Sequence, residues 1–379
     1  MPTTIAVLKE VAPGERRVAM VPEVAQRLAT PGVEVRLEAG AGDSSFFPDS
    51  SYTAANVRVI ADLADVLAGA QIVLAVQPPS AGAITKMGPG TILVTTMNAS
   101  RNLELVRQLK DRRITTFALE LLPRITRAQS MDVLSSQATV AGYEAALIGA
   151  ELCPRFLPML TTAAGTIRPA RVLILGAGVA GLMAIATARR MGALVEAYDV
   201  RRAAGEQVRS LGAKFLELAI NAEGTGGYAR ELTPEEKVEE QKMVATAVAQ
   251  ADVVITTANV PGRRAPRLVS TEMVAQMKPG SVILDLAAES GGNCELTRPG
   301  ENVIVRGVTV SGPLNLPSRL SSHASQMYAK NLQSFLGLLV SKEGHLTADF
   351  SDEILAASLL THGGEVRHGP TRELLGATA

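Results

Sequence analysis

The chain has 379 residues, of which 47% are apolar and 20% are charged, so it is long enough for two globular domains and has the composition of a folded protein. Lys and Arg together number 37, as do Asp and Glu, and the chain contains no Trp. This balance of charge and the low aromatic content argue against nucleic acid or an anionic membrane surface as a partner.

The first third of the chain predicts an open, parallel α/β sheet. Short β-branched or apolar runs alternate with candidate helices, which is the rhythm of such a sheet. The expected strands cover 5–10, 33–40, 57–60, 71–79, 91–96 and 114–119, and the expected helices cover 22–30, 63–69 and 102–111.

A break and then a second α/β series follow. Residues 121–132 are polar and contain a proline, and 135–152 predict a helix that leads into a second domain. The uncharged run 172–188 approaches the length of a membrane helix, but its three glycines favour a strand, a turn and a helix instead. The strands expected in this series cover 171–176, 195–199, 213–218, 253–258, 281–287 and 303–308.

The C-terminal segment predicts a return to the first domain. A helix over 323–340 carries the chain back, and a hairpin is expected around Gly363 and Gly364. Apolar residues of this helix recur at i, i+3 and i+4 spacing, which indicates a stripe that faces a core. They are Ala324, Met327, Tyr328, Leu332, Phe335, Leu336 and Leu339.

The alternation of elements predicts two Rossmann-like α/β domains, each with a doubly wound parallel sheet, separated by a cleft and linked by long helices. The N-terminal domain is expected to be discontinuous and to cover 1–135 and 320–379. The second domain covers 136–319 and carries the nucleotide site.

The motif G-A-G-V-A-G lies directly after one of these strands and directly before a helix. Gly176 permits the tight turn, Gly178 lets the backbone approach a pyrophosphate, and Gly181 lets the helix pack closely on the strand. The helix N-terminus then offers unpaired N–H groups to the phosphates. This context predicts a dinucleotide site.

An acidic residue follows at the end of the next strand, where the adenosine ribose is held in such sites. Asp199 lies there, and its carboxylate would repel a 2′-phosphate, so we expect NAD(H) rather than NADP(H). Arg201 and Arg202 argue instead for NADP(H), because guanidinium groups bind a phosphate well. The alternative for Asp199 is that it only caps the turn at the end of its strand. The expected nucleotide contacts also include Val179, Val200, Gly227 and Asn259.

Several segments closely resemble the NAD(H)-binding domain of the proton-translocating nicotinamide nucleotide transhydrogenases, and this resemblance covers essentially the whole chain. They are RITRAQSMDVLSSQA from Arg124, TTAAGT, the glycine motif and AxxxGGN near residue 290. The early stretch GERRVAMVPE is similar to alanine dehydrogenase, a family that shares this fold.

The resemblance implies roles for the segment 124–135. Arg124, Gln129 and Asp132 would hold the nicotinamide and its ribose, with Ser135 nearby. Hydride passes directly between two carbon atoms, so such a site needs positioning and exclusion of water rather than a general acid or base. The alternative is a solvated loop in which Asp132 or Ser136 caps the following helix.

The glycine-rich segment 219–236 resembles the mobile loop of the transhydrogenases, which closes over the bound nucleotide, and Tyr228 matches its tyrosine. A flexible surface loop is the alternative for this segment.

A transhydrogenase needs a second nucleotide, NADP(H), and this chain has one glycine fingerprint, so the resemblance implies that NADP(H) binds to a partner subunit. The proton channel is also expected on partner subunits, because no segment here predicts a good membrane span. The resemblance also implies a homodimer that is cytoplasmic and bound to the inner face of the cell membrane through those subunits.

An alanine dehydrogenase-like amino-acid oxidoreductase is the alternative activity. That family uses a Lys and a His where this chain has Gln77 and Asn98, although Arg17 matches its substrate-side arginine. A non-enzymatic NAD-sensing module is a third hypothesis, but it would not need the segment 124–132. Cys153, Cys294 and the four histidines have no metal-ligand spacing, so we expect no metal and structural roles for them.

Overall fold

The computed structural model describes residues 2–217, 233–259 and 264–377. The chain forms two compact units, Met1–Gln137 with Ser318–Ala379 and Ala138–Pro317. The sequence prediction places the changes of unit after residues 135 and 319, and the structure divides the chain after 137 and 317. The first unit is therefore discontinuous in sequence.

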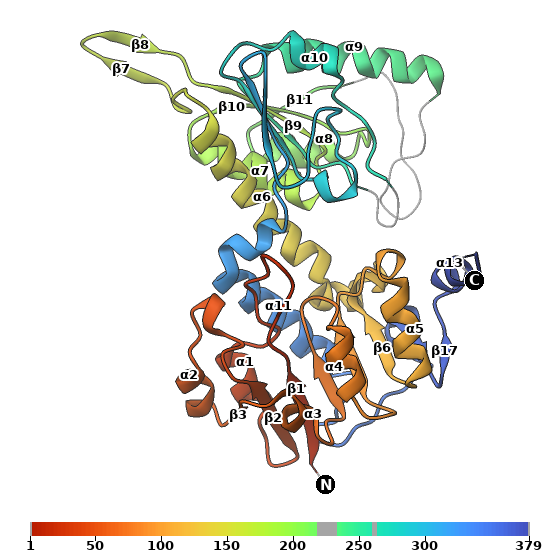
Figure 1. The fold of residues 1–379 in the computed structure, drawn as a ribbon. Coiled ribbons are helices and arrows are strands. Elements are labelled where there is room, and N and C mark those ends of the chain that lie inside the picture. The colour runs from red at the N-terminus through yellow and green to blue at the C-terminus, as the bar shows by residue number, and fades with distance from the viewer. Residues whose placement is uncertain (1, 218–232, 260–263, 378–379) are drawn as a thin grey trace. The chain divides into compact units, whose positions relative to one another are not determined.

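In the described part of the first unit, the strands form an eight-stranded sheet in the order β17-β16-β6-β5-β4-β1-β2-β3 (Figure 1). Neighbouring strands from β1 to β6 are parallel, and β16 and β17 are antiparallel additions at one edge. The strands are β1 (Thr3–Val7), β2 (Val33–Glu38), β3 (Arg58–Ile60), β4 (Ile72–Leu74), β5 (Ile92–Thr95), β6 (Thr115–Ala118), β16 (Leu359–His362) and β17 (Glu365–Val366). Each strand expected in this unit is thus confirmed.

Helices cover both faces of this sheet, so its central strands β1, β4, β5 and β6 are buried on both sides. Ile5 and Val7 pack into one hydrophobic cluster, and Ala6 and Leu8 pack into another, as the alternation of side chains along a strand requires. The helices are α1 (Pro22–Leu28), α2 (Asp49–Ala54), α3 (Leu63–Leu67), α4 (Ala81–Lys86), α5 (Leu103–Asp111), α11 (Ser321–Leu336), α12 (Glu353–Ser358) and α13 (Gly369–Ala377). The sequence did not predict α2, α4, α12 or α13.

Helix α11 supplies a large part of the first core. Of the seven residues predicted for its apolar stripe, five in α11 and Leu339 just beyond its end are buried, and Met327 is half-buried. This helix begins at Ser321, inside the first unit, so the chain returns from the second unit through the 3-10 segment η7 (Leu316–Leu320) rather than through α11. The predicted hairpin is present as well, because Gly363 and Gly364 have φ angles of 63° and 88° and form the turn between β16 and β17.

The second unit repeats the same order of parallel strands. In the part that the structure describes, its main sheet has the order β11-β10-β9-β12-β13-β15-β14, in which only β14 is antiparallel to its neighbour. The strands are β9 (Arg171–Leu175), β10 (Leu194–Tyr198), β11 (Lys214–Phe215), β12 (Val253–Thr256), β13 (Val282–Asp285), β14 (Asn302–Val305) and β15 (Val308–Ser311). The helices are α6 (Val133–Leu152), α7 (Val179–Arg190), α8 (Ala204–Ser210), α9 (Pro234–Gln250) and α10 (Thr271–Ala275). The predicted fold class, two Rossmann-like α/β domains, is confirmed.

Two features of this unit differ from the sequence prediction. The single strand expected over 303–308 is two antiparallel strands, β14 and β15, because Arg306 and Gly307 have φ angles of 50° and 80° and turn the chain. Strands β7 (Leu160–Thr162) and β8 (Gly165–Ile167) form a separate hairpin where no strand was predicted. Figure 1 shows this hairpin projecting from the unit.

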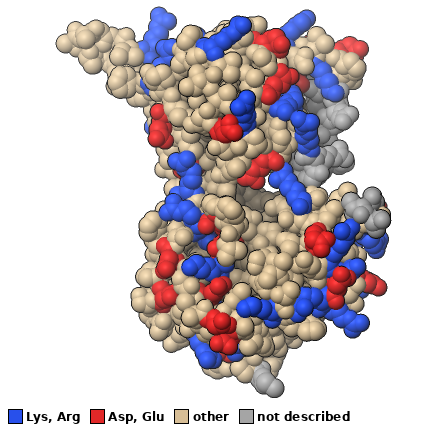
Figure 2. All heavy atoms as spheres, viewed as in Figure 1, with Lys and Arg blue, Asp and Glu red and all other residues tan. Residues whose placement is uncertain are grey.

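The uncharged run 172–188 forms β9, the glycine turn and α7, as predicted. None of the helices in the described part of the chain combines the length and apolar character needed to cross a bilayer. On the face drawn in Figure 2, acidic and basic side chains lie interspersed, which matches the equal numbers of the two in the sequence.

Helices α6 and α7 approach each other closely at a glycine. A Cβ atom on Gly142 would overlap the backbone carbonyl of Ala180. We expect Gly142→Ala to lower the free energy of unfolding by about 2 kcal/mol or more, because backbone must move to make room. Gly82→Ala is the control, since it lies in α4 with only the Ser80 hydroxyl within 4 Å of a new Cβ, and there the better helix propensity of Ala should leave stability unchanged or raised. Chemical denaturation of the two variants tests this, and equal stabilities would contradict it.

Candidate functional site

The glycine motif lies at the carboxyl end of β9, where the strand order of the second sheet reverses. Gly176 has φ of +102°, a left-handed conformation that favours glycine, and a Cβ atom there would lie 2.6 Å from the Thr257 hydroxyl. A Cβ atom on Gly181 would overlap the carbonyl oxygen of Gly176. The turn therefore needs glycine at these two positions for reasons internal to the protein.

The middle glycine is different. Gly178 has φ of −78° and ψ of −167°, which other residues adopt readily, and nothing lies within 4 Å of a Cβ atom built there. It precedes α7, whose first residue, Val179, is 42% exposed. The described protein thus gives no packing reason for glycine at 178. The open space beside the helix N-terminus suits an anion that approaches the backbone.

Asp199 follows β10 and contacts the glycine turn directly. Its Oδ2 accepts a hydrogen bond from the backbone N–H of Ala177 at 2.8 Å. Its two oxygens also accept hydrogen bonds from Nε and Nη2 of Arg201, each at 2.9 Å, and the side chains of Asp199 and Arg201 are 8% and 28% exposed. Arg201 therefore neutralises the carboxylate that was expected to hold the ribose.

The remaining cofactor candidates of this unit lie around the same strand ends. Val200 is half-buried beside Asp199, and Asn259 is exposed in the segment that follows β12. Gly227, Tyr228 and the rest of the glycine-rich segment up to residue 232 lie outside the described residues.

The candidates in the first unit run from Arg124, just before the 3-10 segment η4 (Thr126–Met131), to Ser135 in the first turn of α6. Ala128 and Met131 are buried and anchor the segment, and Asn331 Nδ2 donates to the carbonyl of Ser130 at 2.8 Å. Arg124 and Gln129 are exposed. The segment is thus held on its inner side and presents polar groups on its outer side.

Asp132 and Ser135 are bonded to each other. The carboxylate of Asp132 accepts the Ser135 backbone N–H at 2.9 Å and its hydroxyl at 2.5 Å, which caps the first turn of α6. The capping role weighed for Asp132 from the sequence is therefore present in the structure.

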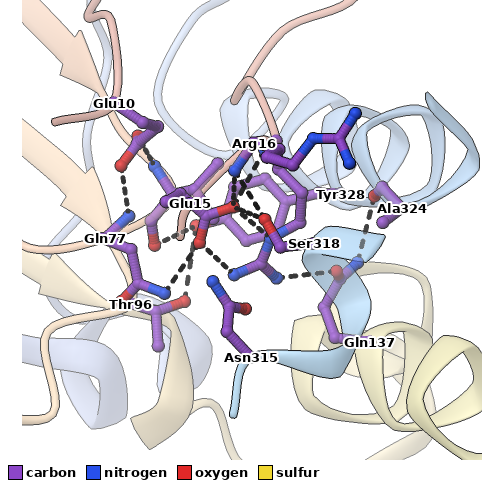
Figure 3. A network of polar contacts seen from close by, with 12 residues as sticks. Glu10, Glu15, Arg16, Gln77, Thr96, Gln137, Asn315, Ser318, Ala324 and Tyr328 are labelled. Carbon is purple, nitrogen blue, oxygen red and sulfur yellow. Dashed lines mark hydrogen bonds and ion pairs between the residues drawn. The ribbon is translucent and has the colours of Figure 1, made fainter. Parts of the chain in front are cut away.

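A second polar cluster lies in the first unit, at the point where the order of its own sheet reverses (Figure 3). Arg17 donates from Nε and Nη2 to the two oxygens of Glu15 at 2.8 and 2.6 Å, and from Nη1 to Gln137 at 2.8 Å. Glu15 also accepts hydrogen bonds from Gln77 Nε2 at 3.0 Å and from the Ser318 hydroxyl at 2.8 Å. The side chains of Glu15 and Arg17 are 0% and 7% exposed, so this is a buried, fully bonded ion pair.

A second glutamate, Glu10, belongs to this cluster (Figure 3), and the pKa values of Glu10 and Glu15 are shifted in opposite directions. Burial alone would favour neutral Glu15, but the hydrogen bonds and the charge of Arg17 hold its pKa at about 2. For Glu10, burial dominates and raises the pKa to about 7, even though backbone N–H groups of Val76 and Gln77 donate to it. The cluster therefore contains one firmly ionised carboxylate and one that titrates near neutral pH.

The cysteines show no sign of reactivity. Cys153 and Cys294 are both buried, and burial raises the pKa of each thiol, that of Cys294 to about 11. In the described part of the chain, no group of three or more His, Cys, Asp or Glu side chains is arranged to hold a metal ion.

Sequence reasoning missed residues that hold the site together. Thr257, which follows β12, donates its hydroxyl to the carbonyl of Gly176 at 2.9 Å. The sequence signal that could have identified Thr257 is its position just after a parallel strand, next to the point where the strand order reverses. Glu15 and Asn293 lie inside the segments GERRVAMVPE and AxxxGGN, but the sequence does not show which groups they bind.

Two family models match the chain, the alanine dehydrogenase/PNT N-terminal domain over 6–141 and the alanine dehydrogenase/PNT C-terminal domain over 145–369. An NAD(P) transhydrogenase alpha-subunit polypeptide of Rhodospirillum rubrum is 45% identical over 96% of this chain and 97% of its own length. Alanine dehydrogenase of Bacillus subtilis is 30% identical over 98% of this chain and 94% of its own. A crystal structure of transhydrogenase from Sinorhizobium meliloti, 46% identical, superposes with a TM-score of 0.87 over 96% of this chain and 99% of that one. The resemblance expected from the motifs is confirmed.

The three glycines should respond differently to substitution. We expect Gly181→Ala to destabilise the fold strongly, because its Cβ meets backbone, whereas Gly178→Ala should cost no more than about 1 kcal/mol of stability. Gly178→Ala should nevertheless weaken NADH binding by about tenfold or more, because the methyl group occupies the space kept for the pyrophosphate. Thermal unfolding and NADH titration of both variants test this. Unchanged NADH affinity in Gly178→Ala would contradict it.

The buried ion pair should dominate the stability of the first unit. Glu15→Gln leaves the Arg17 charge buried without a counter-charge, so we expect a loss of about 3–5 kcal/mol. Glu15 has an ordinary pKa of 4.5 and a folded pKa of about 2, so its contribution is present above pH 4.5 and is lost as the pH falls toward 2. The variant should therefore lose that part of the acid sensitivity, as chemical denaturation across this pH range would show. Glu23→Gln is the control, since its pair with Arg27 is exposed and contributes little.

Proposed function

This chain belongs to the alanine dehydrogenase/PNT family, and on that basis we propose that it is the NAD(H)-binding subunit of a proton-translocating NAD(P) transhydrogenase. In this proposal NAD(H) binds to the second unit, and hydride passes directly between it and NADP(H) on a partner subunit. Proton translocation belongs to the membrane partner. The chain itself is cytoplasmic and reaches the membrane only through those subunits.

The observation that carries the proposal is the open position at Gly178. The other two glycines of the motif are required by contacts within the protein, but this one is not. No contact within the described protein requires glycine at 178, but a bound pyrophosphate would require it there. The position lies beside the N-terminus of α7 and directly after Ala177, whose N–H donates to Asp199.

We propose that Arg124, Gln129, Asp132 and Ser135 hold the nicotinamide and its ribose, and that Tyr228 closes over the nucleotide. Arg124 and Gln129 are exposed on a segment that is anchored from within, which suits groups that must keep their place while contacting a ligand. Direct hydride transfer requires alignment of two rings at about 3.5 Å and no proton exchange with the protein. Polar positioning groups are sufficient for that chemistry.

The alternative, an amino-acid oxidoreductase, needs a cation free to bind the carboxylate of an oxo acid and a group that transfers protons. Arg17, the arginine that matches that family, has its Nε, Nη1 and Nη2 atoms engaged by Glu15 and Gln137. Gln77 donates to the same glutamate, and Asn98 is exposed with φ of 47°. These contacts support a structural role for the cluster rather than a substrate site.

We also propose that the chain forms a homodimer. The hairpin β7–β8 projects from the second unit (Figure 1), and exposed apolar side chains lie on it and just before it. Phe156, Met159 and Ile167 are 56%, 64% and 48% exposed. A second copy of the chain would remove this apolar surface from water.

Reconstitution tests the proposed activity. We expect the purified chain to bind NADH and, after addition of an NADP(H)-binding transhydrogenase domain, to catalyse hydride exchange between NADH analogues and NADP(H). The chain without that domain should show no exchange. Turnover of NADH with pyruvate and ammonia by the chain alone would instead establish the amino-acid oxidoreductase.

Asp199 and Arg201 should set the choice between NADH and NADPH. In Asp199→Asn the acid that we propose binds the ribose is lost, and the Arg201 guanidinium no longer faces the negative charge of Asp199, so it attracts a 2′-phosphate more strongly. We expect NADH affinity to fall by about tenfold or more and NADPH affinity to rise by a similar factor. The control is Asp199→Asn combined with Arg201→Ala, which should lose the gain for NADPH. An unchanged ratio of dissociation constants in the single variant would contradict this prediction.

A further inference from the structure

The motif G-G-N follows β13 and wraps the backbone around a buried carboxylate. Gly291 and Gly292 have φ angles of +99° and +78°, which two successive residues with side chains would rarely adopt. A Cβ atom on Gly292 would also lie 2.8 Å from Oδ2 of Asp285. The two glycines are therefore needed so that the chain can turn tightly against Asp285.

Asp285 is fully buried at the carboxyl end of β13 and accepts hydrogen bonds only from neutral groups among the contacts that the structure describes. Oδ2 accepts the backbone N–H of Asn293 at 2.7 Å and of Cys294 at 3.0 Å, and the hydroxyl of Thr297 at 2.6 Å. Oδ1 accepts the backbone N–H of Ala287 at 2.9 Å and the hydroxyl of Thr256 at 3.0 Å. This set of bonds holds residues 293 and 294 in one position relative to the sheet.

The side chain of Asn293, itself fully buried, extends from this turn to the segment that follows β12. Its Oδ1 accepts the backbone N–H of Ala258 at 3.1 Å, and its Nδ2 donates to the carbonyls of Ala258 and Pro266, both at 2.8 Å. One side chain thus binds both backbone polar groups of Ala258. The preceding residue, Thr257, is bound to Gly176 on the other side.

This arrangement lies on one side of the point where the strand order reverses. In Rossmann-like sheets the two halves of a dinucleotide lie on opposite sides of that point. The glycine motif and Asp199 follow β9 and β10, so the adenosine half belongs there. The segments after β12 and β13 therefore border the nicotinamide half.

We propose that Asn293, oriented by Asp285, is a positioning residue for the nicotinamide half of the bound nucleotide. It acts through Ala258, by fixing where the segment after β12 leaves the sheet toward Asn259. This inference rests on the proposed function, because it assumes that the second unit binds NAD(H).

The test compares a whole dinucleotide with its adenosine half. In Asn293→Ser the three hydrogen bonds to Ala258 and Pro266 are lost, and we expect the dissociation constant of NADH to rise about tenfold while that of ADP changes less than twofold. Hydride exchange in the reconstituted complex should slow as well. Ser281→Ala is the matched control, because Ser281 is equally buried and bonded to Ala251 at the opposite end of β13, and it should leave both dissociation constants unchanged.

The outcomes separate the inference from the function on which it rests. Equal weakening of NADH and ADP in Asn293→Ser would mean that Asn293 only stabilises the fold, and would overturn the inference while leaving the proposed function intact. Failure of the unaltered chain to bind NADH at all would overturn both.

A measurement on the unaltered chain covers the case in which Asn293→Ser does not fold. Hydrogen exchange of the Ala258 amide reports on the Asn293 contact directly. We expect saturating NADH to slow this exchange and saturating ADP to leave it unchanged. Equal slowing by the two ligands would overturn the inference.

Discussion

The second unit depends on the close contact between two loops at the carboxyl ends of β9 and β12. Gly181 packs against the carbonyl of Gly176, and the same carbonyl accepts the hydroxyl of Thr257. Side chains at either glycine would separate these loops. The contact makes the turn before α7 rigid, which matters because a backbone that binds phosphate must have its N–H groups oriented before the ligand arrives.

Each unit contains a carboxylate paired with an arginine of the same unit. Asp199 is bonded to Arg201, and Glu15 to Arg17, so neither carboxylate is left without a partner. The two pairs differ in burial and therefore in consequence. The partly exposed Arg201 can move away from Asp199 at modest cost, whereas Arg17 could leave Glu15 only at the cost of a buried, uncompensated charge.

The two sheets share one order of parallel strands but use the reversal point differently. In the second unit an open position remains there at Gly178, beside a helix N-terminus. In the first unit the corresponding point is filled by Glu15, Arg17, Gln77 and Tyr328, whose polar atoms bind one another and the nearby backbone (Figure 3). The same topology thus supports a nucleotide site in one unit and a packed polar core in the other, and the side chains decide which.

The sequence alone determined most of the parallel strands, the glycine turn and the family, because each of these depends on local periodicity or on spacing along the chain. Only the tertiary structure decided the hydrogen-bond partners. The pairing of Asp199 with Arg201 and the contacts of Asn293 with Ala258 depend on side-chain directions that no local pattern specifies. The cap that Asp132 forms on Ser135 is different, because helix capping is a local pattern that the sequence already offered as an alternative. The contacts of Asn293 and Arg17 also join residues that are distant in the chain. Such contacts exist only once the sheets have brought their strand ends together, so they cannot be inferred from spacing.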